Sequence, residues 1–96
     1  MVKGKYYYVW DDNYSGFMIG KCLGAFTEED EFKRCNATFI CTFPANKSLI
    51  NKYSWCYESN QRHYREATTD EIEWLELCIK KGKFIEKPIN LIYELW

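Results

Sequence analysis

The sequence predicts an α+β fold, in which a small, curved antiparallel sheet of about five strands is followed by one C-terminal helix. Three observations lead to this prediction. Short runs rich in aromatic and β-branched residues alternate with turn-forming residues over the first two thirds of the chain. Glycines recur inside one of these runs, where they favour bends in a strand. A capped, amphipathic helical pattern then follows.

Length and composition support one domain. The chain has 96 residues, too few for two hydrophobic cores, so we expect a single domain over residues 1–96. Hydrophobic residues make up 47% and charged residues 28%, as in a folded globule. We expect the sheet over residues 5–67, the helix over 69–81 and a C-terminal segment over 83–96. The net charge of −1 gives no overall attraction to nucleic acid.

The first two predicted strands are separated by a turn. Residues 5–10 (KYYYVW) are aromatic and β-branched, which favours a strand. Residues 11–16 (DDNYSG) have turn chemistry, and residues 17–26 continue as a second strand. Gly20 and Gly24 lie inside this second strand and favour a bend, a bulge or a close backbone approach. Such curvature suits a partial barrel of the SH3- or OB-like type.

Four later segments are also predicted as strands: residues 32–36, 37–43, 52–58 and 63–67. The strongest of these is 37–43, because its residues alternate between two faces. One face carries Ala37, Phe39, Cys41 and Phe43. Pro44 and the polar residues that follow it are predicted to end this strand.

The helix has a predicted start, an apolar stripe and a stop. Thr68 and Glu71 form the T-x-x-E pattern of a capping box, which places the start at about residue 69. Gly82 suits the left-handed position that ends a helix. The residues that share one helical face are Ile72, Trp74, Leu75, Cys78 and Ile79. This stripe is expected to cover the sheet, so each feature of the segment has a structural explanation.

The last residues fit two patterns. Ile89, Leu91, Tyr93 and Leu95 alternate as in an edge strand, whereas Ile89, Ile92, Tyr93 and Trp96 fit a short helix. Periodicity does not separate the two at this length.

The helical segment has a further property. Its pattern, R-x-A-T-x-x-E-x-x-W-L-E-x-C-I-K-x-G-K-F-I over residues 65–85, resembles a recurrent C-terminal segment of small uncharacterised proteins from Bacteroidota and their phages, including crAss-like phages. Those proteins commonly have Pro at the first helical position, where this chain has Thr69. The resemblance implies a small, phage-linked cytosolic protein with a sheet before a packed helix, and it implies no known activity.

No pattern in the sequence predicts an enzyme, a metal site or a cofactor. His63 is the only histidine, and no family signature surrounds it, Cys41 or Cys56. A zinc site from Cys35, Cys41, Cys56 and His63 would need spacings that match no usual zinc motif. The five cysteines are an odd number without a secretory signal, so we expect reduced thiols in a cytoplasmic protein. No run is long and apolar enough to cross a membrane.

Aromatic residues suggest a binding surface. Tyr6, Tyr8 and Trp10 alternate along the first strand, and Tyr53, Trp55 and Tyr57 alternate along a later one. One small core does not hold both rows, so we expect one of them to be partly exposed. Lys and Arg exceed acidic residues between positions 33 and 65. The expected binding residues are Tyr53, Trp55, Tyr57, Arg62 and Arg65.

Two function classes follow from this surface. The first is a non-enzymatic protein-binding module, which the resemblance described above implies to be a phage accessory factor that inhibits a host protein of the defence machinery. The alternative is a protein that binds or sequesters a nucleotide or single-stranded nucleic acid through its aromatic and basic sheet surface. Neither class fixes the oligomeric state.

Overall fold

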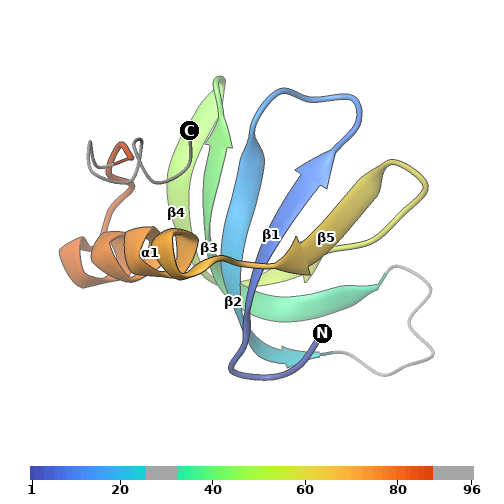
Figure 1. Ribbon diagram of the computed structural model, residues 1–96, viewed down its shortest axis with the longest axis horizontal. Coiled ribbons are helices and arrows are strands. Elements are labelled where there is room, and N and C mark those ends of the chain that lie inside the picture. Colours follow the sequence, from blue (N-terminus) through green and yellow to red (C-terminus); the bar gives the residue numbers. More distant parts are fainter. Residues whose placement is uncertain (26–32, 88–96) are drawn as a thin grey trace.

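The computed structural model describes residues 1–25 and 33–87, and it confirms the predicted α+β fold. One antiparallel sheet of five strands is followed by one helix, which lies on one side of the sheet (Figure 1). The elements are β1 (Tyr6–Asp11), β2 (Phe17–Ala25), β3 (Arg34–Phe43), β4 (Asn46–Cys56), β5 (Arg62–Glu66) and α1 (Thr69–Lys81). The choice between strand and helix near the C-terminus concerns residues outside the described ranges.

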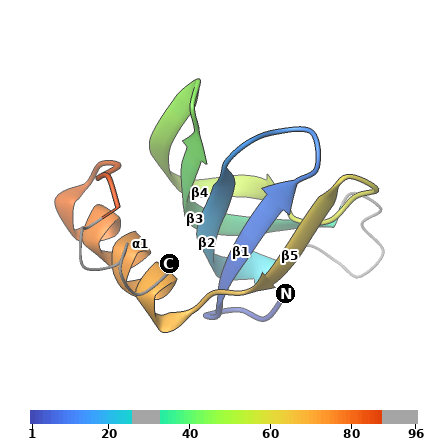
Figure 2. The same ribbon diagram turned by 45° about the horizontal axis from the view of Figure 1, so that its top comes forward.

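The order of the strands forces the sheet to curl. It is β4-β3-β2-β1-β5, so β4 and β5 form opposite edges. Only residues 57–61 connect these two edges along the chain. This connection is not extended, because it turns where the Ser59 N–H donates to the Arg62 carbonyl at 3.1 Å. It is therefore too short to span a flat five-stranded sheet, and the edges must approach each other. The sheet is open rather than closed, and Figure 2 shows β3 and β4 bending along their length.

Two irregularities produce this bend. The register between β3 and β4 shifts between Ala37 and Phe39, and Lys52 on β4 has a φ of 51°. A second shift lies between Cys22 and Gly24, where β2 pairs with β3. Such bulges raise the local twist of a strand. Gly20 has a different role: a Cβ atom there would lie 2.7 Å from the Trp55 ring. The predicted roles of the strand glycines, at a bulge and at a close approach, are therefore both present.

The boundaries of β3 and β4 differ from the sequence prediction. The two segments predicted as separate strands form one strand, β3. After a turn at Pro44 and Ala45, β4 begins at once with Asn46, where an irregular connection was expected. The reason is that β4 is an edge strand, whose backbone pairs with β3 while many of its side chains are exposed. An edge strand can therefore be built from polar residues that look like a loop.

The two faces of the sheet bury separate cores. The inner face, inside the curl, packs Tyr7, Val9, Met18, Cys22, Cys35, Ala37, Phe39, Cys41 and Trp55. The outer face packs Ile19 and Ile40 against Trp74, Leu75 and Cys78 of α1. The alternation predicted for β3 is thus confirmed, because Phe39 and Ile40 serve opposite cores. The helix stripe covers the outer face of β2 and β3.

The ends of α1 are as predicted. The Glu71 N–H donates to the Thr68 hydroxyl at 3.3 Å, and the Thr68 N–H donates to the Glu71 carboxylate at 2.8 Å. Gly82 ends the helix with a φ of 73°, and its N–H donates to the Cys78 carbonyl at 2.8 Å. The predicted capping box and glycine stop are therefore both present.

Candidate functional site

The two aromatic rows lie in different environments. Trp55 is only 2% exposed and stacks on Phe39 inside the curl, with ring centroids 5.3 Å apart. Its neighbour in the row, Tyr53, is 63% exposed. Tyr57 is half-buried and meets the edge of Tyr64 on β5, at 5.2 Å between centroids. This row therefore contributes a core residue, an exposed residue and a contact between the edges of the sheet.

The row on β1 lines the outer face beside the helix. Tyr6, Tyr8 and Trp10 are half-buried there. The Tyr6 hydroxyl donates a hydrogen bond to Glu76 of α1, and burial together with this bond raises the pKa of Tyr6 to about 12. Tyr8 stacks on Phe17 of β2 with a centroid separation of 4.6 Å. Tyr8 and Trp10 continue past the helix and remain accessible.

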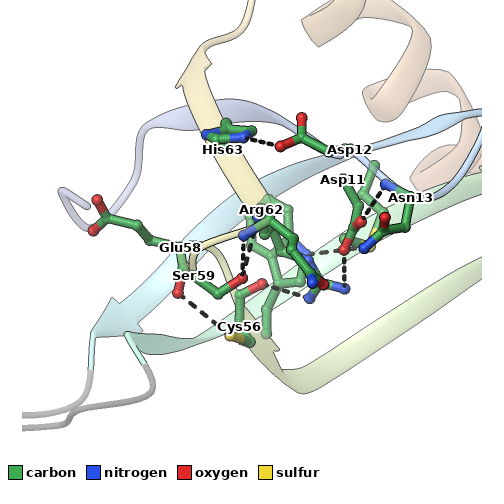
Figure 3. Close-up of polar contacts among 11 residues, drawn as sticks. Asp11, Asp12, Asn13, Cys56, Glu58, Ser59, Arg62 and His63 are labelled. Carbon is green, nitrogen blue, oxygen red and sulfur yellow. Dashed lines mark hydrogen bonds and ion pairs between the residues drawn. The ribbon is translucent and has the colours of Figure 1, made fainter.

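Arg62, expected in the binding surface, holds the curl of the sheet together (Figure 3). It lies on the inner face, where its guanidinium donates to the Cys56 carbonyl at 2.8 Å and lies 3.8 Å from the Asp11 carboxylate. The Tyr57 N–H donates to the Lys33 carbonyl, so the carbonyl of Cys56 points away from β3. Arg62 therefore satisfies a carbonyl on the side of β4 that faces away from β3.

Arg65 lies on the opposite face of β5 and joins the sheet to the helix. Its two terminal nitrogens donate to the two oxygens of the Glu71 carboxylate, each at 2.9 Å. Its guanidinium also lies over the Tyr8 ring, 4.1 Å from the centroid. Burial alone would raise the pKa of Glu71, but the hydrogen bonds from Arg65 and Thr68 lower it overall. The charge of Arg65 is therefore already compensated.

A groove opens where β1, the turn after it and β5 meet on the outer face. Its volume is about 450 Å³. The lining residues are Tyr8, Trp10, Asp11, Tyr14, Gly16 and Arg65. We call this the aromatic groove. Of the five binding residues predicted from sequence, only Arg65 lines it. Tyr14 was read only as part of a turn, and the signal that could have found it is an aromatic residue in a turn that follows an aromatic strand.

Ring contacts fix the walls of the aromatic groove. The Trp10 ring lies 5.8 Å from Tyr8 and 5.4 Å from His63. Tyr14 is 62% exposed, and one face of its ring stacks on Phe43 at 5.6 Å. A second hollow of about 370 Å³ adjoins the groove through Gly16 and reaches Trp74, Phe84 and the ion pair of Lys47 with Glu86. The groove is thus shaped by side chains that neighbouring rings already hold.

The polar atoms of the groove divide into used and unused groups. The Asp11 carboxylate accepts from the Asn13 N–H at 2.8 Å and faces Arg62 (Figure 3). The Trp10 indole N–H and the Tyr8 and Tyr14 hydroxyls have no hydrogen-bond partner among residues 1–25 and 33–87. By contrast, the indoles of Trp55 and Trp74 donate to Met18 sulfur and the Ile85 carbonyl. The aromatic groove therefore offers unused donors.

Compared with known protein families, curated proteins and solved structures, this chain shows no match.

In the described structure, neither the histidine nor any of the cysteines lines the aromatic groove. His63 Nε2 lies 2.9 Å from the Asp12 carboxylate on the outer face, whereas Cys41 is buried in the inner core. All five cysteines are free thiols. Over the described ranges, no three His, Cys, Asp or Glu side chains gather as metal ligands. Nor does the part of the chain that the structure describes contain a helix long and apolar enough to cross a membrane.

Proposed function

We propose that the protein is a non-enzymatic protein-binding module that contacts its partner through the aromatic groove. The observation that carries the proposal is the set of unused donors on half-buried and exposed rings, gathered in one hollow. Interfaces are enriched in Tyr, Trp and Arg, which combine large apolar area with a polar tip. Trp10, Tyr14 and Arg65 provide this combination within one groove.

Two contacts favour a protein partner over a nucleotide or single-stranded nucleic acid. Bases stack on free ring faces, but one face of Tyr8 is covered by Arg65 and the other by Phe17. Phosphate binding needs cations whose charge is available, but Arg65 is held by the buried Glu71 carboxylate. The nucleic-acid alternative therefore remains an outcome of the test rather than a second proposal.

The setting of this function is also proposed. The resemblance of residues 65–85 to proteins of Bacteroidota and their phages supports a phage accessory factor. The odd number of cysteines supports a cytoplasmic location, here the cytoplasm of the bacterial host. We propose that the partner is a host protein, and that binding inhibits its action in defence.

Affinity capture from a host lysate tests this proposal, with Trp10→Ala and Tyr53→Ala as a matched pair of variants. Both replace an accessible aromatic residue, but only Trp10 lines the groove. We expect the wild type and Tyr53→Ala to retain the same host protein. Trp10→Ala should fail to retain it, because the substitution weakens the binding free energy by more than about 1 kcal/mol.

Three outcomes would contradict the proposal. Loss with Tyr53→Ala alone would favour the surface predicted from sequence. A captured species that absorbs at nucleic-acid wavelengths and dissociates steeply with salt would favour the alternative. Turnover of a substrate that Trp10→Ala abolishes would identify an enzyme.

A further inference from the structure

The aromatic groove carries an imbalance between hydrogen-bond donors and acceptors. Indole and guanidinium groups donate hydrogen bonds but do not accept them. Trp10 supplies the indole of the groove and Arg65 supplies the guanidinium. The hydroxyls of Tyr8 and Tyr14 can donate as well as accept. The one carboxylate in the lining, Asp11, is 8% exposed and already faces Arg62 and the Asn13 N–H. The groove therefore presents positive partial charge without a free carboxylate to offset it.

This pattern of donors and charges indicates what kind of occupant would fit the groove. Each charged residue of the lining is compensated by a residue outside it, since Arg65 faces Glu71 and Asp11 faces Arg62. An uncharged occupant rich in carbonyl oxygens and poor in N–H groups would match the donors without leaving its own donors unpaired. Proline provides this, because it has a carbonyl but no backbone N–H. In a polyproline II helix the carbonyls are free, since the helix has no internal hydrogen bonds.

Other peptide conformations match the groove less well. An α-helix uses its own carbonyls internally, so it could not accept from Trp10 or Tyr14 through its backbone. An added β-strand needs an open sheet edge, but β1 is paired on one side with β2 and on the other with β5. Aromatic walls also suit proline rings, which pack on them as apolar surfaces. The volume of about 450 Å³ suits a short segment rather than a broad, flat face.

We propose that the aromatic groove binds a proline-rich segment of the partner in the polyproline II conformation. Trp10, Tyr14 and Tyr8 donate hydrogen bonds to its carbonyl oxygens, and the rings of Trp10 and Tyr14 hold the prolines. This inference rests on the proposed function, since it names the chemistry of the partner at the same groove.

The test is a titration of the protein with decaproline. Binding is monitored by nuclear magnetic resonance, through the indole N–H signals of the tryptophans. A serine-glycine decapeptide of equal length serves as the matched probe. Trp10→Phe assigns the Trp10 signal and keeps a ring while removing the donor. We expect a saturable shift of the Trp10 signal with decaproline, while the buried Trp55 signal stays in place. Trp10→Phe should weaken binding about 2–10-fold, the loss of one hydrogen bond. Tyr53→Phe should not change it.

The inference is overturned if decaproline at millimolar concentration leaves the Trp10 signal unmoved, or if the serine-glycine peptide shifts it equally. Tyr14→Phe provides a second donor deletion if Trp10→Phe unfolds the protein. The proposed function can survive this failure. If a captured host protein depends on Trp10 but decaproline does not compete with it, the groove binds protein by other chemistry. If neither partner nor peptide depends on Trp10, both proposals fail.

Discussion

Arg62 and Arg65 lie three residues apart on β5, but each stabilises a different region of the molecule. Arg62 lies on the inner face and bonds an edge carbonyl of β4, so it holds the two edges of the curled sheet together. Arg65 lies on the outer face and makes two parallel hydrogen bonds to the Glu71 carboxylate, so it holds the helix against the sheet. The comparison teaches that an excess of basic residues in a sequence does not predict a basic surface. Because side chains alternate between the two faces of β5, Arg62 pairs with Asp11 and Arg65 pairs with Glu71.

The largest expected effect concerns the inner core. Replacing Trp55 by Ala should lower the free energy of unfolding by about 3–5 kcal/mol, because a buried ring that fills the curl is lost. Replacing the exposed Tyr53 should change it by less than about 0.5 kcal/mol. Urea unfolding of both variants measures this difference. Equal losses would mean that the two aromatic residues do not occupy the different environments described above.

A second pair of variants compares the arginines directly. Arg65→Ala should cost about 1.5–3 kcal/mol, because it leaves the buried Glu71 carboxylate without its charged donor. Arg62→Ala should cost about 0.5–1.5 kcal/mol, since it removes one close hydrogen bond and a longer ion pair. Arg65→Lys keeps the charge but not the two parallel bonds, and should lie between wild type and Arg65→Ala. A larger loss from Arg62→Ala in thermal melting would reverse the ranking.

The ion pair on the outer face should make the stability of the protein depend on pH in acid. The pKa of Glu71 in the folded protein is lowered from its ordinary value of 4.5. Ionised Glu71 therefore stabilises the fold above pH 4.5, and this contribution is lost as the pH falls through the lowered, folded-state pKa. Stability should decline more steeply with acid in the wild type than in Glu71→Gln, which has no such titration. Parallel curves of unfolding free energy against pH would contradict this reading.

The last pair of variants concerns the helix cap. Thr68→Ala removes the hydroxyl that accepts from the Glu71 N–H, and should cost about 0.5–2 kcal/mol. Thr68→Ser keeps the acceptor and should retain most of the stability. Calorimetry of the three proteins provides the measurement. If Thr68→Ala melted like the wild type but lost its partner, the helix N-terminus would be a contact surface rather than a structural cap.

Local patterns predicted the parts of the fold that depend on neighbours in sequence. Both ends of α1 could be placed because capping and glycine stops act over a few residues. The alternation of β3 could be read because a strand repeats every two residues. The early start of β4 could not be read, because an edge strand depends on its partner β3 and not on its own apolar content.

The candidate site was predicted only in outline. A surplus of aromatic residues predicted that one row would be accessible, but not that Trp55 would face Phe39 while Tyr8 and Trp10 line a groove. The bulge at Lys52 and the curl of the sheet decide this placement, and both arise from pairings between distant segments. Arg65 could be named because it is basic and follows aromatic residues. Its carboxylate partner became apparent only with the helix in place.

The pairing of β1 with β5 also has a consequence for the order of folding. Tyr8 lies opposite Arg65, so one edge of β1 stays unpaired until β5, the last strand of the chain, has docked. Closing so long a loop costs entropy before any contact repays it, which slows folding in proteins rich in distant pairings. The clamp between Arg65 and Glu71 forms only after β5 has docked. We therefore expect the hairpins of β1–β4 to be protected from hydrogen exchange early in refolding, and α1 together with the wall of the aromatic groove to be protected last.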